Sequence, residues 1–196
     1  MNKSSRLVHG IGVKGMDYPA WENGKDTKEY ALWSSMLERC TKKLWIKRPT
    51  YTGTTCSENF KSYTFFYEWC REQKGFSELW QLDKDILVKG NKIYDENSCV
   101  FVPQRLNKLL IKSDASRGDF PLGVSWYNLT KKFQSRCHDG SGKSKHLGYF
   151  TDSEQAFQAY KTFKEALIKE VANEYKDLID PRAYQALLNY TVEITD

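Results

Sequence analysis

The stretch PLGVSWYNLTKKFQSRCHDGSGKSKHLGYFTDSEQAFQAYKTFKEA, residues 121–166, contains three short segments typical of β-strands and then one typical of an α-helix. Turn-forming residues separate the strand segments. The strands are expected at Leu122–Tyr127, Lys132–His138 and Lys145–Phe150, with turns at Asn128–Thr130 and Gly140–Gly142. Because the turns are short, we predict a three-stranded antiparallel sheet.

The apolar residues change to helical spacing after the third strand. Thr151 can cap a helix, and Glu154, three residues on, can bond back to it. The helical pattern continues to about Tyr175, and Pro181 is expected to start one more helix. The prediction is a sheet packed on one long helix, an architecture that many functions use.

Particular residues in this stretch resemble the Apetala-type DNA-binding domain of plant ethylene-response factors, which is also found in phage nucleases. The matching residues are Gly123-Val124, Lys132-Phe133, Ser135-Arg136, His146–Phe150, Thr151-Asp152, Glu154–Ala156 and Ala159-Tyr160. The resemblance implies that the sheet, not the helix, enters the major groove of duplex DNA, which is wide enough for a β-ribbon.

The resemblance also implies a DNA-facing set of side chains on the strands and turns. The candidates are Ser125, Tyr127, Lys131, Lys132, Arg136, Lys143 and Lys145, with Trp126 added in one of the two possible registers. Lysines here would contact phosphates, and Arg136 is the candidate for a base edge. Related plant domains have Arg where this chain has Ser125, which argues against strong sequence specificity. The alternative is a small module that binds protein.

Helices and a hairpin are expected in the first part of the chain. Apolar residues recur at three- and four-residue spacing over 28–43 and over about 58–74. Further along, Leu82 and Ile86–Val88 are strand-like, and Ile93-Tyr94 could pair back on them across a turn. Cys99–Val102 is apolar, and Gln104–Leu110 could form a short helix.

These elements together predict an α+β protein of two modules. The first, 1–112, has N-terminal helices and a ββα unit at 80–110. The second, 120–196, has the three-stranded sheet and its long helix, and the polar stretch 113–119 links the two.

Residues 80–110 resemble the HNH nuclease motif, a ββα element that holds a metal between hairpin and helix. The resemblance matches Asp83 to the metal-binding Asp, Asn97 to the middle Asn and Asn107 to the last Asn, while Lys84 stands in place of the His. It implies Mg²⁺ or Mn²⁺ held by Asp83 and Asn97, with water and phosphate completing the shell. Together the two resemblances indicate a phage-type homing endonuclease that hydrolyses phosphodiester bonds in duplex DNA.

Lys84 alters the expected chemistry. A His takes a proton from water near neutrality, whereas a Lys, with an ordinary pKa of about 10.4, is already protonated. Lys84 is therefore expected to stabilise phosphate charge or to form a salt bridge, and Asp85 or a metal-bound hydroxide could act as the base. Two interpretations stay open: an endonuclease with a modified site, or an inactive DNA-binding protein, such as a regulator or phage counter-defence factor, that retains the nuclease fold.

Composition excludes several classes of protein. The 196 residues are 40% hydrophobic and 28% charged, which suits a packed chain and excludes collagen and disordered proteins. No apolar run reaches the roughly 18 residues of a membrane span, and the first residues lack a secretory signal. We therefore expect no membrane partner and a cytoplasmic protein, in the host cytoplasm if a phage encodes it. Five widely spaced cysteines without a CxxC pair predict reduced thiols and no zinc.

Charge is distributed unevenly along the chain, which carries a formal +5. Residues 1–50 hold ten basic and five acidic side chains, residues 117–147 hold six and two, and residues 170–196 are acidic. Two basic regions suit a protein that grips a polyanion at two places, and the expected partner is double-stranded DNA. An ordinary surface of uneven charge is the alternative, and nothing indicates a protein partner.

Overall fold

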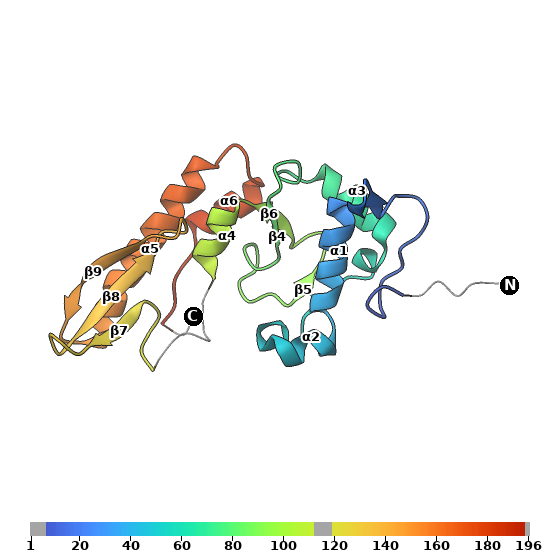
Figure 1. Cartoon of the computed structure of the whole chain (residues 1–196). Helices are drawn as coiled ribbons and strands as arrows, with labels where there is room; N and C mark the ends of the chain where they lie inside the picture. The colour runs from blue at the N-terminus through green and yellow to red at the C-terminus, as the bar shows by residue number, and fades with distance from the viewer. Residues whose placement is uncertain (1–6, 112–118, 195–196) are drawn as a thin grey trace. The chain divides into compact units, whose positions relative to one another are not determined.

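The structure is a computed structural model that describes residues 7–111 and 119–194 (Figure 1). It has the predicted α+β class, with helices and several small sheets. The chain divides into two compact units between Phe101 and Val102, and each unit is described by itself. The sequence placed the boundary after residue 112, but the short helix before that point packs against a helix of the second unit. The predicted linker 113–119 lies outside the described residues except for Asp119.

The first unit consists of short helices and two-stranded pairings. Its helices and 3-10 turns are α1 (Lys28–Arg39), α2 (Lys42–Lys47), η1 (Pro49–Tyr51), η2 (Asn59–Lys61) and α3 (Tyr63–Glu72). Its strands are β1 (Trp21–Glu22), β2 (Lys25–Asp26), β3 (Thr55–Cys56), β4 (Gln81–Asp83) and β5 (Ile93–Tyr94), with β6 (Val100–Val102) at the boundary.

The core of the first unit is aromatic. Trp33, Phe60, Tyr63 and Phe66 are fully buried, and the Trp33 indole donates to the Phe60 carbonyl at 2.7 Å. The helix predicted over 28–43 is in fact two, because the hydroxyl of Thr41 caps α2 by accepting the amide of Leu44. The helices and strands of the first unit are short, so the burial of large aromatic side chains is the main source of its folding stability.

The hairpin predicted within residues 80–110 is wrong in its pairing. β4 pairs with β6, whereas β5 pairs in parallel with β3 from a distant part of the chain. Ile86–Val88 is not a strand, because the carboxylate of Asp83 accepts the amides of Asp85 and Ile86 and turns the chain there. An Asp side chain that binds amides two and three residues on is a common way to end a strand.

The second unit is a sheet covered on one face by a long helix, as predicted. The strands β7 (Val124–Tyr127), β8 (Lys132–His138) and β9 (Ser144–Phe150) are antiparallel in the order β7-β8-β9. The helix α5 (Ser153–Glu174) packs on the sheet, and α4 (Gln104–Leu110) and α6 (Pro181–Leu188) pack on α5. The helix cap is Asp152 rather than Thr151, since Asp152 accepts the amide of Glu154 at 2.7 Å.

None of the helices in residues 7–111 and 119–194 is long and apolar enough to cross a membrane.

Candidate functional site

The two faces of the three-stranded sheet differ in what covers them. Along β8, Ser135 and Cys137 are buried beneath α5, whereas Lys132, Arg136 and His138 are exposed. The register extends this alternation to both neighbouring strands. We call the uncovered side the outer face; its residues are Ser125, Tyr127, Lys132, Gln134, Arg136, His138, Ser144, His146 and Tyr149.

A cluster of aromatic and polar side chains lies at the centre of the outer face. The rings of Tyr127 and Tyr149 are stacked with centroids 5.2 Å apart, and the ring of His146 lies 4.6 Å from that of Tyr149. The amide nitrogen of Gln134 lies 3.3 Å from Nδ1 of His146 and 3.4 Å from the hydroxyl of Tyr149. Gln134 is only 6% exposed, so the cluster is held in place by a buried amide.

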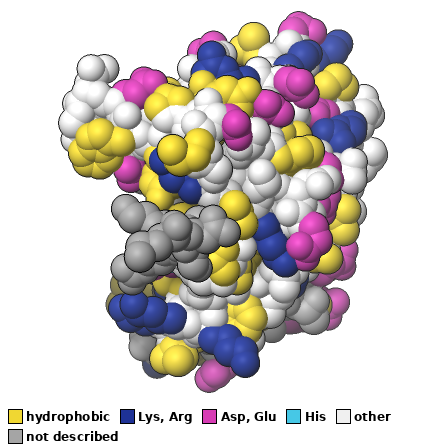
Figure 2. All heavy atoms as spheres, turned by 90° about the vertical axis from the view of Figure 1, so that its right-hand side faces the viewer, with side chains coloured by type: hydrophobic (Ala, Val, Ile, Leu, Met, Phe, Trp, Pro, Cys, Tyr) yellow, Lys and Arg dark blue, Asp and Glu magenta, His cyan; other side chains and the backbone are white. Residues whose placement is uncertain are grey.

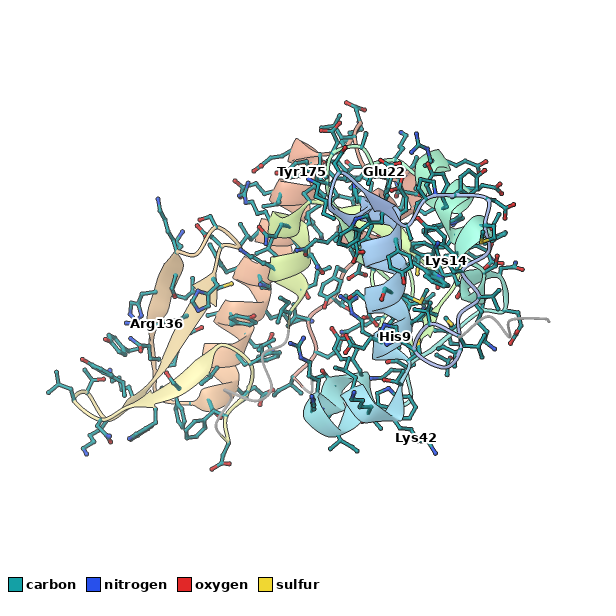
Figure 3. The ribbon with its side chains drawn as sticks, turned by 45° about the vertical axis from the view of Figure 1, so that its right-hand side comes forward. His9, Lys14, Glu22, Lys42, Arg136 and Tyr175 are labelled. Atoms are coloured by element: carbon teal, nitrogen blue, oxygen red, sulfur yellow. The ribbon has the colours of Figure 1, made fainter. Side chains whose placement is uncertain are left out.

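Cations surround this cluster. Lys132 and Arg136 lie on β8, and Lys131 and Lys143 lie in the two turns of the sheet; all four are exposed. Figure 3 shows Arg136 on this sheet. Within residues 119–150 of the described chain, the structure gives none of the four an acidic partner. By contrast, the face of the molecule in Figure 2 carries acidic and basic side chains side by side.

Asp139 lies in the turn between β8 and β9, and its carboxylate accepts hydrogen bonds from that turn. Asp139 accepts the hydroxyl of Ser141 and the amides of Ser141 and Lys143, at 2.8–3.1 Å from Oδ1. The Ser141 hydroxyl and these amides hold the pKa of Asp139 below its usual value, so the carboxylate stays ionised while it accepts the hydrogen bonds of the turn. Asp139 therefore offsets at most one of the four positive charges at this face.

The predicted DNA-facing residues do not all lie on one side of the sheet. Ser125, Tyr127, Lys132 and Arg136 lie on the outer face, and Lys131 and Lys143 lie at its ends. Lys145 is a correction: its ammonium lies 4.7 Å from the ring centroid of Phe163 on α5, on the covered side. Trp126 also lies on the covered side, edge-to-face with Phe133.

A β-bulge explains the position of Lys145. Ser135 pairs with Gly148, but Arg136 pairs with His146, so β9 carries one extra residue there. The shift pairs Lys145 with the inward-facing Cys137 and brings His146 onto the outer face. Sequence reasoning missed Gln134, His138, His146 and Tyr149. The alternation along β8 could have indicated Gln134 and His138, whereas the bulge in β9 leaves no sequence signal for the face of His146.

The residues matched to the nuclease motif are spread over both units. Asp83 ends β4, Asn97 is exposed in the turn before β6, and Asn107 lies on α4 in the second unit. The turn at Asn97 is built by Asp95, whose Oδ1 accepts the amides of Asn97 and Ser98. Asp83 is largely buried, and burial raises the pKa of its carboxyl despite the two amides it accepts.

Lys84 is buried and paired, which confirms one of its two expected roles. It is 7% exposed, its ammonium lies 2.7 Å from Asp85 Oδ2, and it also donates to the carbonyl of Asn91. Asn91 in turn donates to the Lys84 carbonyl at 2.9 Å and to the Ser98 hydroxyl at 3.0 Å. An ammonium held in this way fastens the loop and is poorly placed to take a proton from water.

The donor set at Asp83 fits a divalent cation only in part. Mg²⁺ is commonly bound through one or two carboxylates, with water and phosphate as the other ligands, so Asp83 with Asn97 is chemically suitable. One oxygen of Asp83 already accepts two amides, however, and no group of three or more His, Cys, Asp or Glu residues in the described part of the chain could hold a metal. The arrangement offers a ligand but no evident general base.

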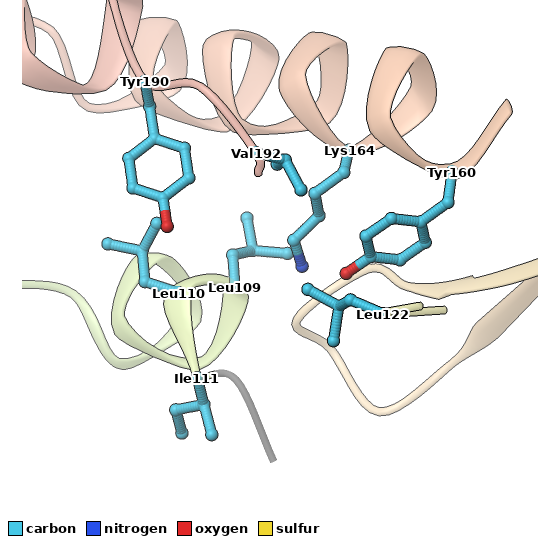
Figure 4. Close-up of a pocket in the computed structure, with 8 residues that line it drawn as sticks. All are labelled: Leu109, Leu110, Ile111, Leu122, Tyr160, Lys164, Tyr190 and Val192. Atoms are coloured by element: carbon cyan, nitrogen blue, oxygen red, sulfur yellow. The ribbon is translucent and has the colours of Figure 1, made fainter. Parts of the chain in front are cut away.

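A small cavity in the second unit holds a buried lysine (Figure 4). It has room for about 10 Å³ and is lined by Leu109, Leu110, Ile111, Leu122, Tyr160, Lys164, Tyr190 and Val192. Burial lowers the pKa of Lys164, which is 7% exposed. A space of this size holds about one water molecule and no organic substrate.

Comparisons of the chain with protein-family models, curated proteins and solved structures gave no match.

Proposed function

We propose that the protein binds double-stranded DNA through the outer face of its three-stranded sheet. The observation that carries this proposal is the group of exposed cations, Lys131, Lys132, Arg136 and Lys143, around the Tyr127–Tyr149–His146 cluster. A β-ribbon fits the major groove, cations contact phosphates, and Arg136 and His146 can reach base edges. This function belongs in the cytoplasm, where reducing conditions keep the thiols free.

The sheet supplies its own matched control for this proposal. Lys132 and Lys145 carry the same charge on neighbouring strands, but only Lys132 lies on the outer face. A labelled duplex is titrated with wild type, Lys132→Gln and Lys145→Gln at several salt concentrations. Lys132→Gln is expected to weaken binding and to lower the slope of log K against log salt by about one, whereas Lys145→Gln leaves both close to wild type.

Arg136→Ala tests a base contact rather than a phosphate contact. If Arg136 contacts a base edge, its loss weakens binding to a selected duplex by about 1–3 kcal/mol, which is roughly five- to more than a hundredfold. The proposed interface would be contradicted if Lys132→Gln and Lys145→Gln changed the affinity and its salt dependence equally. It would also be contradicted if the single variants Arg136→Ala and Lys132→Gln both bound the duplex as tightly as wild type.

Metal-assisted hydrolysis of DNA is a second candidate. It is favoured by the order β4, β6, α4, in which two paired strands precede a helix and Asp83 ends the first strand. When bound, Mg²⁺ or Mn²⁺ would neutralise developing phosphate charge, and Asp83 and Asn97 would hold the ion. Lys84 stands in place of the motif's His and is paired with Asp85, so the ion pair engages both candidate residues, and this favours the DNA-binding function over the nuclease.

A plasmid assay separates the two candidates. Supercoiled plasmid is incubated with wild type or Asp83→Asn in Mg²⁺ and in Mn²⁺; the Asn keeps an oxygen for the amides of Asp85 and Ile86. Binding without nicking supports the DNA-binding function alone. Metal-dependent nicking that Asp83→Asn abolishes would establish the nuclease.

A further inference from the structure

The surface around α2 in the first unit carries several cations from one stretch of sequence that contains no acidic residue. From Arg39 to Ser57 the chain has five basic residues and no acidic one. Four of the five lie on α2 or directly after it, and we call Lys42, Lys43, Lys47 and Arg48 the α2 patch. All four are exposed, and Figure 3 labels Lys42 at the outer side of α2.

Three cations elsewhere in the same unit have acidic partners. Arg71 pairs with Glu29, Lys61 with Glu58 and Lys84 with Asp85. Among the residues of the first unit that the structure describes, it gives the α2 patch no such pair. Lys43 and Lys47 are also four residues apart on one helix, a spacing at which like charges repel. A bound polyanion would remove this repulsion.

Hydrogen bonds and packing fix the patch on the unit. The indole of Trp45 donates to the carbonyl of Arg39 at 2.9 Å, and Thr41 caps the helix. After α2, Tyr51 donates its amide to the carbonyl of Arg48, and Lys92 donates to the carbonyl of Thr50 at 2.8 Å. The cations are thus presented from a folded surface, which reduces the entropy lost on binding.

We propose that the α2 patch is a second contact surface for the phosphate backbone of the duplex that the outer face binds. This inference rests on the proposed function. Charge complementarity favours a polyanion, and the patch has the exposed lysines and arginine that contact phosphates without selecting a sequence. An anionic membrane is the less suitable occupant, because α2 has six residues and only one large apolar side chain that is largely exposed, Ile46 at 85%.

Two triple variants of the full chain test the assignment. The first is Lys42→Gln/Lys43→Gln/Lys47→Gln. The control is Lys14→Gln/Lys25→Gln/Lys74→Gln, which removes the same charge from exposed sites elsewhere in the first unit. Both are titrated with a labelled duplex over a range of salt, together with vesicles of phosphatidylserine, and circular dichroism checks that both are folded.

We expect the first variant to lower the slope of log K against log salt by about two to three and the control to lower it much less. If wild type binds with a steep salt dependence but the two variants behave alike, the α2 patch is not a contact surface and the proposed function stands. If wild type shows no salt-dependent complex, the proposed function fails as well. Vesicle binding lost only in the first variant, with duplex binding unchanged, would also overturn the inference.

Discussion

The side-chain amide nitrogen of Gln134 lies 3.3 Å from Nδ1 of His146, across the β8–β9 pair. An amide nitrogen donates, so this contact is a hydrogen bond when Nδ1 accepts, which is the case for the neutral ring that carries its proton on Nε2. The ring then presents a donor to a partner on the outer face. Guanine N7 and O6 are acceptors in the major groove, so this tautomer suits a contact with a G·C pair.

We predict that long-range ¹H–¹⁵N NMR at pH 8 finds His146 as the Nε2–H tautomer in wild type. Gln134→Leu removes the amide, and the two tautomers should then be mixed. His138, which also lies on the outer face, is the internal reference, since the hydrogen bonds of the Gln134 side-chain amide go to His146 and Tyr149. A predominant Nδ1–H form in wild type would show that the hydrogen bond does not set the ring.

Lys84 is predicted to stabilise the first unit rather than to catalyse a reaction. Lys84→Ala removes the ion pair with Asp85 and the bond to the Asn91 carbonyl, and should lower the free energy of unfolding by about 1–3 kcal/mol. Denaturant unfolding measures this, with exposed Lys74→Ala as the control. Lys84→His, which restores the residue of the motif, should not produce plasmid nicking. Nicking by that variant would place position 84 in an active site.

Replacing the buried Lys164 with Met is predicted to stabilise the second unit. Burial lowers the pKa of Lys164 in the folded state. Between this lowered pKa and the ordinary pKa of about 10.4, the unfolded chain therefore binds more protons than the folded chain. Its contribution to stability therefore increases as pH rises through this window. Lys164→Met should remove this part of the slope and raise the free energy of unfolding at pH 7 by about 1–3 kcal/mol.

Denaturant unfolding between pH 6 and pH 10 measures this slope. Lys169→Met on the exposed side of α5 is the control and should keep the wild-type dependence. If Lys164→Met also keeps the wild-type pH dependence of the unfolding free energy, the Lys164 ammonium is solvated in the folded protein and contributes nothing to the slope.

Gly123 is predicted to tolerate a side chain much less well than Gly142. Its φ is +77°, and a Cβ there would overlap the ring of Tyr160 on α5. Gly142 also has a positive φ, +101°, but a Cβ there would meet open space. Gly142→Ala should cost about 1–2 kcal/mol from backbone strain alone, and Gly123→Ala should cost at least twice as much. Similar losses of unfolding free energy in the two variants would mean that α5 can move away from the sheet.

The local elements could be predicted where neighbouring residues determine them. Turn residues around Gly140 and the cap before Ser153 are contiguous signals, and the sheet and α5 were accordingly found with nearly correct bounds. Pairing between distant segments leaves no such signal. The parallel pairing of Tyr94 with Cys56 places both residues at the aromatic core, which spacing along the chain does not reveal.

The candidate site was predicted in part for a related reason. Alternation along a strand assigns faces only while the register holds, and the bulge opposite Ser135 and Arg136 reverses the faces of the residues before it on β9. This is why Lys145 was assigned to the wrong face and His146 was missed. The pairing of Lys84 with the adjacent Asp85 was among the expected roles, because two neighbouring carboxylates favour it whatever the fold.

A ¹H–¹⁵N NMR titration of the full chain with duplex DNA at low salt tests directly whether the outer face binds DNA. We expect the signals of Arg136, His146 and Tyr149 to shift together and saturably, whereas those of Phe163 and Lys145 on the covered side of the sheet change little. Shifts confined to the covered side, or none anywhere on β7, β8 and β9, would contradict DNA binding by the outer face.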